Sequence, residues 1–177
     1  MSLEKIEGSH VFVGPIPHSI TPFVDAKIKI LFAVHMDEEL KKALIKKGIK
    51  VQIVPPILDP EISPKLMTKI TTLANKSKGN VAFTCLAGAH VSNAYAGTYL
   101  IQKGWPLNKI MKGLDKISVK VAHHHISPGL AVGIRETIKF SQLNFLKTVG
   151  ELRKQAKQKR AMVKKKPIKK KTTRKIK

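Results

Sequence analysis

The only cysteine of this 177-residue chain stands where a short apolar run meets a helical pattern. The run Asn80–Cys85 (NVAFTC) is typical of a buried strand, and after a turn the helical pattern continues to about residue 103. In such a turn, backbone N–H groups converge and the helix dipole adds to their attraction for an anion. A thiol placed there is nucleophilic. The stretch therefore predicts an anion-binding loop, made of Cys85, Leu86, Ala87, Gly88, Ala89, His90, Val91 and Ser92.

The elements that must position this loop alternate along the chain. Apolar, β-rich runs predict strands over residues 11–14, 27–34, 50–54 and 80–85, with prolines breaking the chain between the first two. Apolar periodicity and capping residues predict a helix over residues 37–48 and a second from Ser63-Pro64 to about Gly79. Further helices are predicted after the loop, from Pro106, after Ser127-Pro128, and over residues 138–152. This order predicts an α/β fold with a central, mostly parallel sheet flanked by helices.

Charge separates the chain into two parts. Lysine and arginine number 34 against 11 acids, which gives a net charge of +23, and residues 151–177 contain fourteen of those bases but only one acid, Glu151. We predict a folded domain over residues 1–152 and a basic, Lys-rich tail over 153–177 that cannot bury a core by itself. The strongly positive electrostatic field of such a chain favours polyanions as binding partners, and nucleic acid is the commonest of these. The predicted nucleic-acid-binding residues are Arg153, Lys154, Lys157, Lys159, Arg160, Lys164, Lys165, Lys166, Lys169, Lys170, Lys171, Arg174 and Lys175.

Several classes of protein are disfavoured. No apolar run approaches the roughly 20 residues that span a bilayer, so we expect no membrane partner. The opening MSLEKIEGSH has acids and no apolar stretch, unlike a signal or transit peptide. One cysteine allows no intrachain disulfide, which fits a reducing compartment. Adjacent histidines on an extended segment point to alternate sides, so we expect no metal at His123–His125 and no cofactor.

The loop resembles that of the cysteine-dependent dual-specificity protein phosphatases, whose signature is His-Cys, five residues, then Arg and Ser or Thr. It is similar at Cys85, at Gly88 and at Ser92. The stretches VFVGPIPHS, KGIKVQIVPPILDPE, AYAGTYLIQKGWPLNKIMKGL and FSQLNFLKTVGEL also resemble family segments in the same order, over residues 8–152. The resemblance implies the phosphatase fold, with Cys85 in the position of the nucleophile and Asp59 in that of the general acid.

Two departures from the signature bear on catalysis. Val91 occupies the arginine position, and valine cannot grip phosphoryl oxygens in a bidentate fork. Thr84 replaces the histidine before the cysteine, and His90 is one position too early to replace the arginine. Loss of such a clamp lowers a rate by on the order of 10³-fold or more. We therefore expect an inactive pseudophosphatase, in which Asp59 is a loop residue and Cys85 is either a small buried hydrophobe or part of a weak anion site.

Three functions remain open from the sequence. The first is a catalytically inactive domain that binds RNA, with ribosomal RNA foremost, as a structural component of a ribonucleoprotein such as a ribosomal particle. The second is a nuclear pseudophosphatase that binds a phosphorylated protein, with KKKPIKKK as a localisation signal. The third is a weak, atypical cysteine phosphatase. The expected location is intracellular, at a mitochondrial ribosome or in the nucleus or nucleolus.

Overall fold

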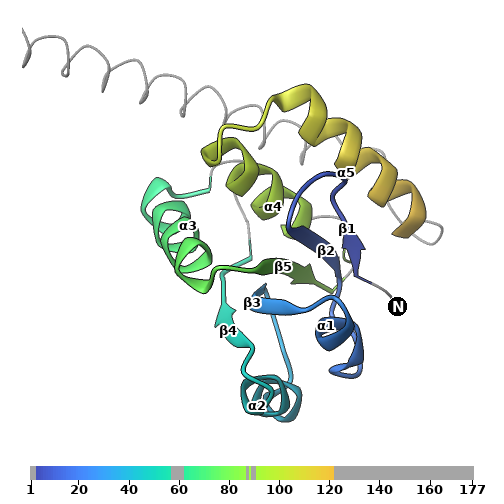
Figure 1. Ribbon diagram of the computed structural model, residues 1–177, viewed down its shortest axis with the longest axis vertical. Helices are drawn as coiled ribbons and strands as arrows, with labels where there is room; N and C mark the ends of the chain where they lie inside the picture. Colours follow the sequence, from blue (N-terminus) through green and yellow to red (C-terminus); the bar gives the residue numbers. More distant parts are fainter. Residues whose placement is uncertain (1–2, 57–61, 87, 89–90, 122–177) are drawn as a thin grey trace, which may run out of the picture. The chain divides into compact units, whose positions relative to one another are not determined.

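Strand β5 (Asn80–Cys85) lies at the centre of a five-stranded sheet with the order β1-β2-β5-β3-β4 (Figure 1). The computed structural model describes residues 3–56, 62–86, 88 and 91–121. Strands β2 (Val11–Pro15), β3 (Ile28–Ala33) and β4 (Lys50–Ile53) are parallel to β5, and only the short β1 (Glu4–Lys5) is antiparallel. The predicted mixed α/β architecture with a mostly parallel sheet is confirmed.

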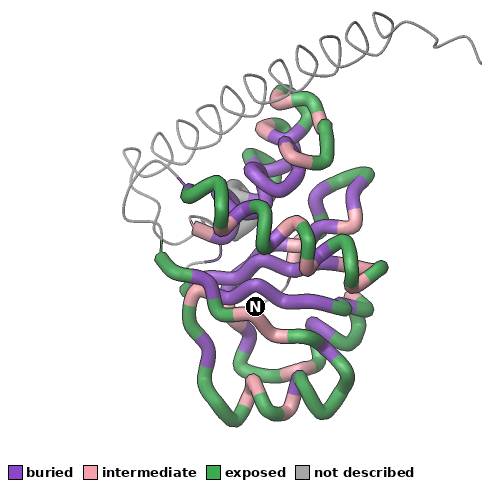
Figure 2. The backbone as a smooth tube through the Cα atoms, turned by 90° about the vertical axis from the view of Figure 1, so that its left-hand side faces the viewer, coloured by how far each residue is buried: buried purple, intermediate pink, exposed green. Residues whose placement is uncertain are grey.

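Both faces of the sheet are covered by helices. Helices α3 (Pro64–Ser77), α4 (Val91–Gln102) and α5 (Leu107–Val121) lie on one side of it, and α1 (Thr21–Asp25) and α2 (Glu38–Lys46) on the other (Figure 1). Figure 2 shows the sheet strands largely as purple, buried backbone between green, exposed helical turns. This double cover explains why β5 is almost entirely apolar, as the sequence predicts for a central strand.

The register of the sheet sends alternate residues to the two helical layers. Leu31 lies beside Ala82, and both belong to the buried cluster that includes residues of α1 and α2. Phe32 lies beside Phe83 with their rings stacked at 5.2 Å, and Phe83 meets Tyr99 of α4 at 5.8 Å. The core is therefore two apolar layers that share one sheet.

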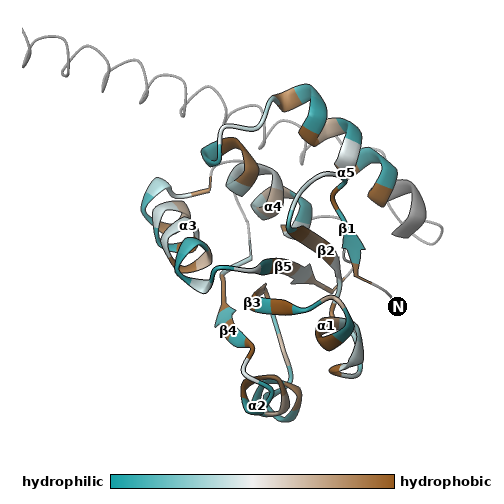
Figure 3. Ribbon diagram, in the orientation of Figure 1, coloured by the Kyte–Doolittle hydropathy of each residue, from teal (hydrophilic) through white to brown (hydrophobic). Residues whose placement is uncertain are grey.

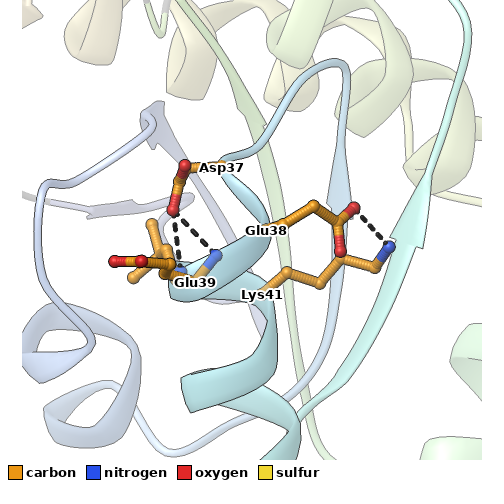
Figure 4. A network of polar contacts seen from close by, with 5 residues as sticks. Asp37, Glu38, Glu39 and Lys41 are labelled. Carbon is orange, nitrogen blue, oxygen red and sulfur yellow. Dashed lines mark hydrogen bonds and ion pairs between the residues drawn. The ribbon is translucent and has the colours of Figure 1, made fainter.

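Helix α2 shows why the predicted helices form where they do. Asp37 is its N-cap, and one carboxylate oxygen accepts hydrogen bonds from the backbone N–H groups of Glu39 (2.8 Å) and Leu40 (3.1 Å) (Figure 4). Lys41 adds an ion pair with Glu38 at 2.9 Å. At the other end Gly48 has a φ of +79°, and the N–H groups of Gly48 and Ile49 bond back to Ile45 and Leu44. These bonds form a Schellman cap, which confirms Gly48 as the stop signal.

Helix α4 differs from its amphipathic neighbours because it is buried all round. Every residue from Ser92 to Ile101 is buried, whereas α5 carries both hydrophobic and hydrophilic residues along its length (Figure 3). Gly104 ends α4 with the same cap as Gly48, at a φ of +81°. Helix α5 follows from Pro106 as predicted, with Ile110 and Leu114 buried and Met111 only half-buried.

Two elements of the fold differ from the sequence prediction. Strand β1 and helix α1 were not expected, because two and five residues are too few to establish a period. Helix α3 ends close to Gly79, as predicted, and its C-cap is Lys78 in the left-handed conformation with a φ of +48°. Gly79 meets a packing need instead, since a Cβ there would overlap the side chain of Lys29.

The remaining predictions of architecture fall elsewhere in the chain. The helices expected after Ser127-Pro128 and over residues 138–152 lie outside the described residues, as do His123–His125 and the basic tail. The division at residue 152 stays a prediction. Among the described helices, none combines the length and the apolar character needed to cross a membrane.

The turn after β5 is held against the end of β2 by Gly88. Its φ is +70°, its N–H donates to the carbonyl oxygen of Cys85 at 3.1 Å, and it is buried. A Cβ at this position would overlap the backbone nitrogen of Pro15. Both the left-handed conformation and the close approach therefore require glycine.

We predict that Gly88→Ala destabilises the protein by about 3 kcal/mol, because left-handed strain adds to overlap with a backbone that cannot move aside. Gly48→Ala is the matched control, since its φ is also positive but no atom lies within 4 Å of the added Cβ. That variant should lose only about 1 kcal/mol. Urea unfolding of both variants measures the difference, and equal losses would show that Gly88 is not packed as described.

Candidate functional site

The candidate loop lies at the carboxyl edge of the parallel strands, between the end of β5 at Cys85 and the start of α4 at Val91. This edge is where ligands bind in open α/β sheets, and a helix begins there whose N-terminus favours anions. The structure describes Cys85, Leu86, Gly88, Val91 and Ser92 of the predicted loop. Ala87, Ala89, His90 and the predicted general-acid position Asp59 lie outside the described residues.

The Cys85 thiol is paired with Ser92 inside the protein. Its sulfur donates to the Ser92 hydroxyl oxygen at 3.3 Å, and the two residues are only 4% and 1% exposed. The six-residue span between the strand end and the first helical turn thus brings the thiol and the hydroxyl together. Burial at this level suits a packing role, because a buried free cysteine behaves as a small hydrophobe.

The exposed surface of the loop is apolar where it is described. Leu86 is 79% exposed and Val91 is half-buried in the first turn of α4. Neither side chain can donate a hydrogen bond or carry charge. Among the described loop residues the donors available to an anion are therefore backbone N–H groups and the Ser92 hydroxyl, and no side chain supplies a positive charge.

Thr84, which precedes the cysteine, belongs to the opposite face of the sheet. Successive strand residues alternate, and because Cys85 meets α4, Thr84 faces the layer of α1 and α2. It is 1% exposed, and its hydroxyl oxygen has no hydrogen-bond partner among the described residues. A group in this position cannot touch a ligand held on the loop.

Tyr95 ties the loop helix to the connection that leads toward Asp59. It lies one turn after Ser92, and its hydroxyl donates to the carbonyl oxygen of Pro55, just beyond β4, at 2.9 Å. Burial raises the pKa of Tyr95 to about 12, so the hydroxyl keeps its proton and remains a donor at neutral pH. The sequence shows the family spacing but not this link, which joins residues 40 positions apart.

A second polar group, which sequence reasoning missed, lies at the amino edge of the same strands. His10, just before β2, hydrogen-bonds the Tyr99 hydroxyl at 3.0 Å, and both line a pocket with Asn75, Lys78 and Asn80. The pocket has a volume of about 330 Å³. No local motif marks it, because His10 and Tyr99 are 89 positions apart. Within the described part of the chain, His, Cys, Asp and Glu nowhere gather in threes that could hold a metal ion.

Solved structures of phosphatases share this arrangement of strands and helices. Tk-PTP is 18% identical with a TM-score of 0.59, over 81% of this chain and 95% of that chain. The catalytic core of the PP-IP phosphatase Siw14 from S. cerevisiae is 17% identical with a TM-score of 0.59, over 86% and 92%. DUSP15 is 16% identical with a TM-score of 0.55, over 85% and 96%.

The chain has the dual-specificity-phosphatase-like fold. The resemblance inferred from the loop and its flanking segments is therefore confirmed at the level of fold. No family model and no curated protein matches the sequence. At these low identities the similarity shows the fold and therefore where the loop lies. What chemistry the loop can carry depends on its own side chains.

We predict that Thr84→Val raises the free energy of unfolding by about 1 kcal/mol, because it removes a buried hydroxyl that lacks a partner and keeps the shape. Thr71→Val makes the same chemical change where the hydroxyl donates to the Gln102 side chain. The second variant should lose about 1 kcal/mol. Chemical unfolding distinguishes the two, and a loss at Thr84 equal to that at Thr71 would contradict the described burial.

Proposed function

We propose that this protein is a catalytically inactive phosphatase-like domain that binds RNA as a structural component of a ribonucleoprotein, with a ribosomal particle and its rRNA as the most specific expectation. The observation that carries the loss of catalysis is Val91, the first residue of α4. A working loop needs a guanidinium there to hold two phosphoryl oxygens and to balance charge in the transition state.

The described residues of the loop offer no replacement for that group, and His90 is one position too early in the sequence. Leu86 and Val91 are hydrocarbon, and the Ser92 hydroxyl already accepts the Cys85 thiol. Neutral donors of this kind bind an anion weakly compared with a charged bidentate pair. The expected rate deficit is on the order of 10³-fold or more relative to a loop with arginine.

Charge supports RNA as the partner. The net charge is +23, and the thirteen tail residues named above supply bases in a segment with little apolar content. Such a segment neutralises backbone phosphates and releases their counterions without reading sequence. Aromatic residues make up only 5% of the chain, which disfavours recognition by base stacking.

A phosphorylated protein is the second candidate partner. The retained turn favours it, since Gly88 is buried at a positive φ and the loop still ends at a helix N-terminus. A pseudophosphatase of this kind would bind phosphopeptides through the backbone of the loop, and that binding would survive loss of tail charge.

We predict that the wild-type protein shows no Cys85-dependent hydrolysis of an aryl phosphate. The assay compares wild type, Cys85→Ser, Val91→Arg and the double variant, with the unfolding midpoint of each as a folding control. Activity that appears with Val91→Arg and disappears in the double variant would support decay from an enzyme. Turnover in the wild type that Cys85→Ser abolishes would overturn the proposal and establish an atypical phosphatase.

We predict steep salt dependence of RNA binding that depends on the tail. In the full chain, six tail lysines are replaced by glutamine: Lys164, Lys165, Lys166, Lys169, Lys170 and Lys171. The slope of log affinity against log salt should fall in magnitude by about 4, at about 0.7 per lost single-strand contact. A shallow slope that these substitutions leave unchanged would contradict RNA binding through the tail, and phosphopeptide binding that persists would favour the second partner.

A further inference from the structure

The amino edge of the sheet carries a pocket that the phosphatase-like loop does not explain. It lies where β5 begins and where α3 and α4 end, and its lining includes His10, Asn75, Lys78, Asn80 and Tyr99. The loop lies at the other end of β5. A six-residue strand spans roughly 20 Å, so one phosphate group cannot contact both sites.

Hydrogen bonds organise the polar side chains of this pocket. His10 and Tyr99 meet at 3.0 Å with their rings nearly perpendicular, and Lys103, just beyond α4, donates to the Asn75 side-chain oxygen at 3.0 Å. Burial lowers the pKa of His10, and the charges of Lys103 and Lys5 lower it further. The histidine is thus mostly neutral at pH 7, and Lys5, Lys78 and Lys103 supply positive charge around it.

The positive surface continues along the turn between β1 and β2 onto α5. Glu7 of this turn forms an ion pair with Lys116 at 2.8 Å, and the charges of Lys116, Lys112 and Lys109 hold the pKa of Glu7 below its usual range. A Cβ at Gly8 would lie 3.5 Å from the Lys109 ammonium nitrogen, which itself sits 4.4 Å from the centre of the Trp105 ring. We name this surface the lysine edge, defined as Lys5, Lys78, Lys103, Lys109, Lys112 and Lys116.

Favourable interactions within the fold explain the positions of only some of these lysines. Lys78 and Lys103 follow helix C-termini, where the dipole favours cations. Lys109 lies in the first turn of α5, which contains no acid, and there the dipole disfavours a cation. Helices α3 and α4 contain no acid at all. On the other elements that carry the six lysines, the acids are Glu4 on β1, Glu7 in the turn after β1 and Asp115 on α5.

We propose that the lysine edge binds the phosphate backbone of RNA, at the opposite end of β5 from the degenerate loop. This inference rests on the proposed RNA-binding function and assigns part of that function to the folded domain rather than to the tail. The lysines lie on β1, at the ends of α3 and α4 and along α5, a spread that suits successive phosphates, and the neutral His10–Tyr99 pair adds donors without opposing charge.

The composition of the surface favours RNA over a membrane or an apolar protein partner. The exposed large apolar side chains among the described residues are Val24, Ile45, Ile53 and Leu86. They belong to α1, α2, β4 and the loop, and none lies on the lysine edge. A surface that inserts into lipid or docks an apolar partner would need such residues.

The test uses two full-length variants that lose the same charge from different places. The edge variant is Lys5→Gln/Lys78→Gln/Lys103→Gln, in which glutamine at position 103 can still donate to Asn75. The control variant is Lys42→Gln/Lys65→Gln/Lys69→Gln, made of exposed lysines on α2 and in the first half of α3. Circular dichroism and the unfolding midpoint verify that both remain folded.

Two readouts follow the titration with a short single-stranded RNA of mixed sequence. The first is the salt slope of the affinity, which should fall in magnitude by about 2 in the edge variant and by much less in the control. The second is the emission of Trp105, the chain's one tryptophan, which lies beside Lys109 and reports on this surface rather than on the tail. We expect RNA to change it in the wild type and control, and to change it less in the edge variant, which loses three of the six lysines but keeps Lys109.

Other results would overturn the inference. RNA binding with equal loss in both variants, or with no change in Trp105 emission, would reject the lysine edge and leave RNA binding to the tail. The absence of salt-dependent RNA binding in the wild type would reject the proposed function as well. Edge-dependent binding to phosphatidylglycerol vesicles or polyglutamate as tight as that to RNA would reject RNA as the specific partner.

Discussion

The pairing of β5 between β2 and β3 is the constraint on which both polar regions of the molecule depend. Because β5 is hydrogen-bonded on both sides and covered by helices on both faces, it has no freedom to shift register without sending its apolar residues to the wrong layer. Its carboxyl end therefore holds Cys85 against α4, and its amino end places Asn80 beside His10 and the end of α3. One strand thus positions the degenerate loop and the pocket of the lysine edge, and keeps them apart.

The sequence predicts most of this architecture, because the relevant signals are local. Asp37 and Gly48 cap α2 through bonds that span a few residues, and the apolar run of β5 identifies a central strand without knowledge of its neighbours. The sequence does not predict elements that are too short to show a period, or contacts between residues far apart in the chain. Strand β1 forms only by pairing with β2, and the His10–Tyr99 bond exists only once the sheet has assembled.

The features of the candidate loop also fall into those that the sequence predicts and those that only the structure shows. The spacing of Cys85 and Ser92 identifies two positions of the signature, and the residue type at position 91 is enough to argue against a charge clamp. The contact between the two side chains is known only from the structure. The burial of the thiol, the orientation of Thr84 away from the loop, and the bond from Tyr95 to Pro55 all depend on tertiary packing. The pattern of residues therefore identifies the loop, whereas its accessibility could come only from the structure.

The backbone shape of the loop is weak evidence of function, because packing requires it. Gly88 is required by the close approach of Pro15, so the turn keeps its form whether or not phosphate chemistry takes place there. A phosphatase-like backbone at this position is thus a property of the fold, and the chemistry of the loop must be judged from its side chains. Lys109 presents the opposite case, because the dipole of α5 disfavours a cation in its first turn, and the local favourable contact is the face of the Trp105 ring. A charge placed against the preference of its own helix is better evidence of a partner than a turn that the fold itself demands.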